Sequence, residues 1–198
     1  PENNADRAPD HSRCRIAAGL QLSARVLTDS LEDRPDVCLT RTRHGQLAGL
    51  LAGGEVEAAL LGPAELQQFG EAMAVIRAGC VSARGCCLGC RVFAQAEARK
   101  VKVVWADPDD RTAVALARIL WEHSLSRPLA VVPYHPDWQP LPPDADAVLV
   151  SGDRVVADPP IGFDRQIDLG AMWYEMTGLP LVLSVWTAPA RQRCCDLH

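Results

Sequence analysis

The 198-residue sequence lacks the long hydrophobic runs that place a protein in or across a membrane. No apolar stretch approaches the roughly 18 residues that such a span needs. Residues 1–13 are polar and charged, without the apolar segment of a secretory signal. We therefore expect a disordered leader over residues 1–13 and a cytoplasmic protein without a membrane partner.

An excess of positive charge is also missing. The formal net charge is −5, whereas non-specific nucleic-acid binding requires clustered basic side chains that displace counterions. Apolar residues make up 48% of the chain and charged residues 23%, which is ordinary for a soluble globular protein. The composition excludes a nucleic-acid partner but leaves small anionic ligands open, because helix ends act locally.

Two familiar catalytic and nucleotide-binding motifs are absent from the sequence. It contains no glycine-rich nucleotide loop and no Gly-x-Ser-x-Gly elbow of the kind found in hydrolases. His44, His123 and His135 each stand alone, so we interpret them as surface or capping residues.

Cysteine, by contrast, is abundant, with eight residues in the chain. Cys14, Cys38 and Cys80 lie in apolar, strand-like contexts, where we expect them to be small buried hydrophobes. Cys87 and Cys90 have C-x-x-C spacing, which serves zinc, an iron–sulfur cluster or redox exchange. A zinc site would need a second ligand pair, and the nearest set in the sequence is Cys194, Cys195 and His198 at the far end. A cysteine-based metal or redox protein is therefore one hypothesis, although chance cysteines are the favoured interpretation.

Strand-like and helix-like segments alternate along the chain, which predicts an α/β fold with a mainly parallel sheet. Expected strands are 15–18, 36–40, 56–61, 86–94, 100–106, 129–133 and 147–151; expected helices are 23–31, 44–52, 64–69 and 111–123. Two units of similar size suggest two lobes with a ligand cleft between them. The predicted division is lobe one over 14–85, lobe two over 86–180, and a crossover strand and tail over 181–198.

Two segments carry candidate site residues. Asp110, Arg111 and Thr112 begin the helix expected at 111–123, where free backbone N–H groups and a hydroxyl can hold an anion. An ordinary capped helix explains this segment equally well, and acidic neighbours oppose an anion. Gly152 and Asp153 follow a predicted strand, which would place a carboxylate in the cleft, although Gly-Asp also favours a simple turn.

The most informative stretch runs from Ile167 to Pro180 and continues into an apolar strand from Leu181 to Trp186. It predicts an amphipathic helix with an acid near its start and a glycine at its end, followed by a strand. Its Asp-Leu-Gly…Trp…Thr-Gly-Leu-Pro…Trp pattern resembles a signature of the chorismate dehydratase-like family of menaquinone biosynthesis. Four further blocks resemble the same family in order: 47–61, 80–85, 110–116 and 147–153.

This resemblance implies the two-lobed fold of type II periplasmic binding proteins. It also implies a carbon–oxygen lyase, a hydro-lyase that converts chorismate to 3-[(1-carboxyvinyl)oxy]benzoate in the futalosine route, with no metal or organic cofactor. By the resemblance, Asp153 and Ser23 are catalytic. The implied substrate-binding residues are Ser82, Arg111, Thr112 and Gly152.

Three departures from the family pattern support a different function. Ser23 stands where the family has asparagine, Gly89 where it has a serine, and Ala113 where it has a second hydroxyl. The alternative hypothesis is a catalytically impaired relative that binds a small carboxylate. The chain also stops soon after Trp186, whereas family members continue, so we expect another cover for lobe one, such as a homodimer partner.

Overall fold

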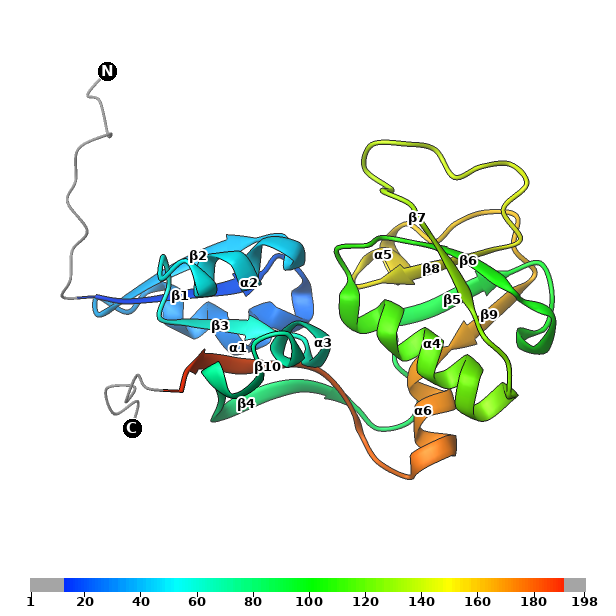
Figure 1. Ribbon diagram of the computed structural model, residues 1–198. Helices are drawn as coiled ribbons and strands as arrows, with labels where there is room; N and C mark the ends of the chain where they lie inside the picture. The colour runs from blue at the N-terminus through cyan, green and yellow to red at the C-terminus, as the bar shows by residue number, and fades with distance from the viewer. Residues whose placement is uncertain (1–12, 191–198) are drawn as a thin grey trace, which may run out of the picture.

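The computed structural model describes residues 13–190. It consists of two α/β units that lie next to each other, each built on a five-stranded sheet (Figure 1). Apart from Arg13, the expected leader lies outside the described residues, as do Cys194, Cys195 and His198. Within residues 13–190, none of the helices combines the length and apolar character that crossing a bilayer requires.

The first sheet has the strand order β2-β1-β3-β10-β4. Its strands are β1 (Cys14–Gly19), β2 (Val37–Thr42), β3 (Ala58–Leu61), β4 (Met73–Ala83) and β10 (Leu181–Pro189). Its helices are α1 (Leu22–Glu32), α2 (His44–Ala52) and α3 (Pro63–Gln67), with a 3-10 turn at Gly70–Ala72. Separate apolar clusters cover the two faces of this sheet, one containing Trp186 and the other Leu47.

The second sheet has the order β7-β6-β8-β5-β9. Its strands are β5 (Cys90–Ala94), β6 (Val103–Ala106), β7 (Ala130–Pro133), β8 (Ala147–Ser151) and β9 (Arg165–Asp168). Its helices are α4 (Arg111–Leu125), α5 (Arg154–Ala157) and α6 (Leu169–Thr177), with a 3-10 turn at Ala98–Lys100. The largest core side chain is the fully buried Trp121, whose indole Nε1 donates to the Val101 carbonyl at 3.1 Å.

Both sheets are mixed, so the prediction of a mainly parallel sheet was wrong. In the first sheet β1 pairs in parallel with β2 and β3, whereas β10 runs antiparallel to β3 and β4. In the second, β6 pairs in parallel with β7 and β8, whereas β5 runs antiparallel to β8 and β9. The antiparallel pairs arise where the chain passes between the sheets, since β4 leaves the first sheet and β10 returns to it (Figure 1).

The strand prediction missed β4, an 11-residue strand that lies outside the expected strand ranges, and two further strands differ from their predicted form. Arg165–Asp168 forms β9, although Ile167 and Asp168 were expected to begin a helix. The strand expected over 86–94 begins only at Cys90, because Leu88 and Gly89 form a turn. The bounds of these two strands follow from the pairing of β5 with β8 and with β9. A local sequence pattern does not reveal such long-range pairing.

The expectation that Cys14, Cys38 and Cys80 are buried hydrophobes was also wrong. Cys38 and Cys80 are exposed and Cys14 is half-buried. Cys38 and Cys80 lie on β2 and β4, the two edge strands of the first sheet, where packed helices cover less of the strand. Edge position therefore overrides the apolar sequence context of these residues.

The helix predicted within Ile167–Pro180 is α6, and its sequence explains both ends. The Asp168 carboxylate accepts from the Ala171 N–H at 2.9 Å and caps the helix, while Gly178 ends it in the left-handed conformation. Asp168 also accepts from the Cys87 N–H at 2.8 Å and from Arg91 Nε at 3.3 Å. The acid thus fastens the segment that leaves β4 to the helix that leads back into β10.

Gly170 allows α6 to approach the segment after β4 closely, because it has no side chain. A Cβ atom at this position would lie 2.4 Å from the Cys87 Cβ and 2.7 Å from the Gly85 carbonyl oxygen. The Asp-Leu-Gly pattern therefore holds the two connections between the sheets close together.

Candidate functional site

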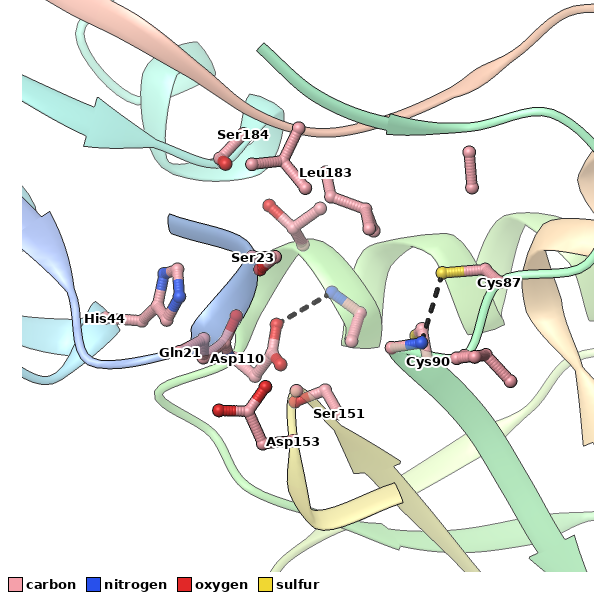
Figure 2. A pocket seen from close by; sticks show the side chains of 18 of the residues that line it. Gln21, Ser23, His44, Cys87, Cys90, Asp110, Ser151, Asp153, Leu183 and Ser184 are labelled. Carbon is pink, nitrogen blue, oxygen red and sulfur yellow. Dashed lines mark hydrogen bonds between the residues drawn. The ribbon is translucent and has the colours of Figure 1, made fainter. Parts of the chain in front are cut away.

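A cavity of about 560 Å³ lies between the two sheets. Side chains from both units point into it (Figure 2). Its walls come from the start of α1, the start of α4, the turn after β8, the residues before β5, the end of β4 and the first half of β10. Small-molecule sites commonly have this size and this position between units.

Five of the six predicted site residues line this cavity. Their common feature is a position at the end of a strand or the start of a helix, and they are Ser23, Ser82, Thr112, Gly152 and Asp153. The sequence therefore identified one continuous surface from segments that are far apart in the chain.

Arg111 is the exception, because it is not among the lining residues. Its exposed side chain points to α3, where Nη1 donates to the Gln68 Oε1 atom. We predicted that Arg111 contacts the ligand. In the structure its side chain is directed away from this cavity, towards α3.

Asp153 reaches across the cavity to the first sheet. It follows β8, and its Oδ2 atom accepts from the Leu22 backbone N–H at 2.9 Å. Leu22 is the first residue of α1, whose own N-cap residue, Gln21, makes no side-chain cap. Asp153 therefore caps a helix of the opposite unit, and the carboxylate predicted to be catalytic also joins the two units.

Thr112 makes a further contact between the units. Its hydroxyl donates to the Glu65 carboxylate at 2.7 Å and accepts from the Ala64 N–H at 3.2 Å. The contact is close because Gly62 has no side chain: a Cβ there would lie 2.2 Å from the Thr112 hydroxyl oxygen. The hydroxyl donor expected for a ligand is thus bonded to buried Glu65.

The backbone N–H groups at the start of α4, which we expected to be free for an anion, also have a partner within the protein. Asp110 is its N-cap, and the carboxylate accepts from the Ala113 N–H at 3.1 Å. Of the two interpretations of this segment, the capped helix is the one that the structure shows. An anion can use this helix end only by displacing Asp110.

The charge on the cavity wall is unusual for an anion site. The lining residues include the carboxylates Glu65, Asp110 and Asp153 but no lysine or arginine. His44 is the only lining side chain that can become positively charged. Uncharged polar groups are therefore available for recognition: the Gln21 amide, backbone groups, and the hydroxyls of Ser23, Ser82, Ser151 and Ser184.

Sequence reasoning missed two contributors to the wall. Ser184 lies in β10 beside an irregularity in its pairing with β4, between Val182 and Ser184, and such bulges often adjoin sites. His44 begins α2, and its Nε2 atom is buried without a hydrogen-bond partner among the described residues. Neither residue lies in a recognisable motif, so only the fold reveals them.

The C-x-x-C cysteines also lie in this wall. Cys87 and Cys90 are 3% and 0% exposed, and burial raises the pKa of both thiols. Within residues 13–190, no group of three or more histidine, cysteine or acidic side chains is arranged to hold a metal ion. A metal site completed by Cys194, Cys195 and His198 would involve residues outside the described range.

A second cavity, of about 680 Å³, adjoins the first and shares five lining residues with it: Gln21, His44, Asp110, Ser151 and Asp153. Across it, Arg43 of the first unit pairs with Asp137 of the second at 3.1 Å. Asp137 also accepts from Arg154 at 3.3 Å. These exposed ion pairs contribute little stability individually, but the Arg43–Asp137 pair adds a further link between the units.

Comparison with known proteins identifies the family. The model of a family described as menaquinone biosynthesis matches residues 16–193. The chain belongs to this family. The resemblance that begins with the Asp-Leu-Gly motif is therefore confirmed over nearly the whole chain.

Solved structures confirm the two-lobed periplasmic-binding-protein type II-like fold. Protein AF1704 from Archaeoglobus fulgidus has a TM-score of 0.68 at 16% identity, covering 95% of this chain and 71% of that protein. The alkanesulfonate-binding protein SsuA from Xanthomonas axonopodis, bound to MOPS, has a TM-score of 0.53 at 15% identity over 93% and 68% of the two chains. A nutrient-binding protein from Burkholderia cenocepacia, bound to methionine, has a TM-score of 0.51 at 11% identity, covering 90% of this chain and 85% of that protein.

Proposed function

We propose that this member of the menaquinone biosynthesis family is a hydro-lyase that binds chorismate between its two lobes and removes water from it. The product would be 3-[(1-carboxyvinyl)oxy]benzoate. The observation that carries the proposal is the convergence of Asp153 and the hydroxyls of Ser23 and Ser82 on one cavity of suitable size.

The reaction needs a group that takes a proton from carbon and a donor for the leaving hydroxyl. Asp153 is the acid best placed for the first task, since it ends β8 at the cavity wall. Its Oδ2 atom is held by the Leu22 N–H, while Oδ1 accepts no hydrogen bond from the described residues and can face a substrate. Ser23, on the first turn of α1, supplies a hydroxyl for the second task. Aromatisation of the ring provides much of the driving force.

Substrate carboxylates would be held by hydroxyls and backbone N–H groups instead of cationic side chains. Ser82 on β4 belongs to this set, whereas the predicted contribution of Gly152 is restricted because its N–H already donates to the Gly89 carbonyl at 2.8 Å. Three protein carboxylates in the same wall oppose a dianion, so affinity should be modest and should weaken further if more negative charge is added.

The first experiment is incubation of the purified protein with chorismate, with product detection by liquid chromatography and mass spectrometry. We expect loss of one water molecule from the substrate. Asp153→Asn should abolish this turnover, because the amide cannot accept the proton, while keeping a side chain of the same shape. Asp144→Asn is the matched control, since Asp144 is exposed and lies outside both cavities. Full activity in Asp153→Asn would remove this residue from the mechanism.

A second candidate function is binding of a small carboxylate without turnover. Gly89 lines the cavity with no side chain, and the Ala113 N–H is already bonded to Asp110. Because losing one well-placed donor typically costs a hundredfold or more in rate, these positions favour impaired catalysis. Tight chorismate binding in calorimetry, with unchanged chorismate after long incubation, would establish this function over the enzyme.

A further inference from the structure

We infer that Cys87 and Cys90 are a site of reversible disulfide formation in the cavity wall. They are the ends of a four-residue turn whose central residues are Leu88 and Gly89. Such a turn brings its first and last Cα atoms within about 7 Å, and disulfides join Cα atoms about 4.4–6.8 Å apart. The backbone therefore already has a separation that a disulfide requires.

The surroundings of the pair favour a disulfide over the other uses of C-x-x-C spacing. Both side chains line the same cavity, and Figure 2 shows them at the same end of it. No third histidine, cysteine or acidic ligand joins them among residues 13–190 in a metal-binding arrangement. Cys86, the adjacent thiol, is exposed, whereas the pair is buried. Because Cys87 and Cys90 line the cavity, a small oxidant that enters it can meet the pair.

The oxidant is a small peroxide, represented by hydrogen peroxide. Burial raises the pKa of the Cys87 thiol, so a minor thiolate fraction reacts: it attacks one peroxide oxygen, the O–O bond breaks, and the products are a sulfenic acid and hydroxide. The Cys90 sulfur then attacks the Cys87 sulfur, the S–O bond breaks, and the two remaining protons leave with oxygen as water. Two thiols and one peroxide give one disulfide and two water molecules. A dithiol reductant reverses the change.

The disulfide would act on the neighbouring turn after β8 through one residue, Gly89. In the reduced protein the Gly89 N–H donates to the Cys87 sulfur at 3.4 Å, and the Gly89 carbonyl accepts from the Gly152 N–H at 2.8 Å. Turning the Cys87 sulfur towards Cys90 removes the acceptor of the first bond and shifts Gly89. Because Gly152 precedes Asp153, oxidation loosens the turn that carries the carboxylate at the centre of the proposed function.

The test uses the whole chain, first reduced and then treated with hydrogen peroxide before the remaining thiols are alkylated. Trypsin cuts after Arg84 and Arg91, so one peptide contains Cys86, Cys87 and Cys90. We expect this peptide to lose two hydrogens and to carry one alkyl group, located at Cys86 by fragmentation. Cys90→Ala should prevent the loss, and Cys86→Ser should preserve it. A fully alkylated peptide, or a bond that includes Cys86, would overturn the assignment.

Hydrogen exchange then tests the coupling without reference to chorismate. The amide of Gly152 should exchange at least severalfold faster in the oxidised protein than in the reduced protein, and dithiothreitol should restore the slow rate. Equal rates would refute the link to Gly152. Since neither readout uses turnover, failure of the proposed enzyme activity would leave both results interpretable.

Discussion

At the scale of single residues, the buried carboxylate of Glu65 has the clearest electrostatic consequence. It is 4% exposed and receives the Thr112 hydroxyl, yet it lies in the wall of a cavity proposed to bind a dianion. Glu65→Gln keeps an oxygen for Thr112 but removes one negative charge. At a separation of about 6 Å this should be worth about 1 kcal/mol, or about fivefold tighter chorismate binding.

Calorimetric titration of both proteins with chorismate measures this difference. Glu71→Gln is the control, because Glu71 is exposed and outside the cavity. Weaker binding in Glu65→Gln would show that the carboxylate positions Thr112 for the ligand, in which case its charge is not the deciding property.

A second prediction at this scale concerns pH. Burial raises the pKa of the Cys90 thiol in the native protein, so the native state keeps its proton at a pH where the unfolded chain has lost it. The resulting stability is fully present below the ordinary thiol pKa of about 8.5 and is lost as pH rises towards the native value. Urea unfolding of the reduced protein should therefore show decreasing stability above about pH 8.5.

Cys90→Ala should flatten that decrease, because alanine does not titrate. Cys38→Ala is the control, since Cys38 is exposed. Identical slopes for the wild type and Cys90→Ala would mean that Cys90 reaches solvent in the native state.

At the scale of elements, the two connections between the sheets depend on Gly170. Gly170→Ala would force a methyl group against the Gly85 carbonyl and the Cys87 Cβ, and overpacking of this kind costs about 1–3 kcal/mol. Gly49→Ala is the matched control, because Gly49 is also helical and has open space around its Cα. We expect Gly49→Ala to be neutral or to stabilise by about 0.5–1 kcal/mol.

Denaturant unfolding measures both variants. If Gly170→Ala were as stable as Gly49→Ala, the close approach of α6 to the Gly85–Cys87 segment would not be a requirement of the fold.

Helices and strands with clear local sequence signals were predicted more accurately than those that depend on long-range pairing. The α2 helix was predicted with the observed bounds because Leu47, Leu50 and Leu51 have helical spacing and Gly53 follows. The α4 helix was predicted from its first residue because Asp110 is a strong N-cap. By contrast, β9 has only four residues and exists through its pairing with β5, which no local pattern encodes.

The site was predictable to a similar degree. The resemblance brought Ser23, Ser82, Thr112, Gly152 and Asp153 together, and all of them line the cavity. The partners of Asp153 and Thr112 could not be foreseen, because Leu22 and Glu65 belong to the opposite unit. Contacts between units depend on how two finished sheets meet, and sequence spacing carries no information about that.

At the scale of the whole molecule, Thr112 tests how the two lobes are held together. Thr112→Val keeps the shape of the side chain but leaves buried Glu65 and the Ala64 N–H without their partner. Such losses cost about 1–3 kcal/mol, and we expect a lower melting temperature. Hydrogen exchange at Ala64 should accelerate as the lobes separate more readily.

Thr40→Val is the control, because Thr40 is exposed on β2. Chorismate affinity should fall in Thr112→Val if closure of the lobes is part of binding. Unchanged stability and unchanged exchange at Ala64 would show that this contact does not hold the lobes together.

The position of β10 between β3 and β4 has a consequence for biosynthesis. The second sheet is complete once residue 168 has been translated, whereas the first sheet lacks one of its interior strands until residues 181–189 emerge from the ribosome. Of the two sheets, the one whose synthesis begins first is therefore the last to be assembled, and the nascent chain must carry an open β3 edge until residues 181–189 are available.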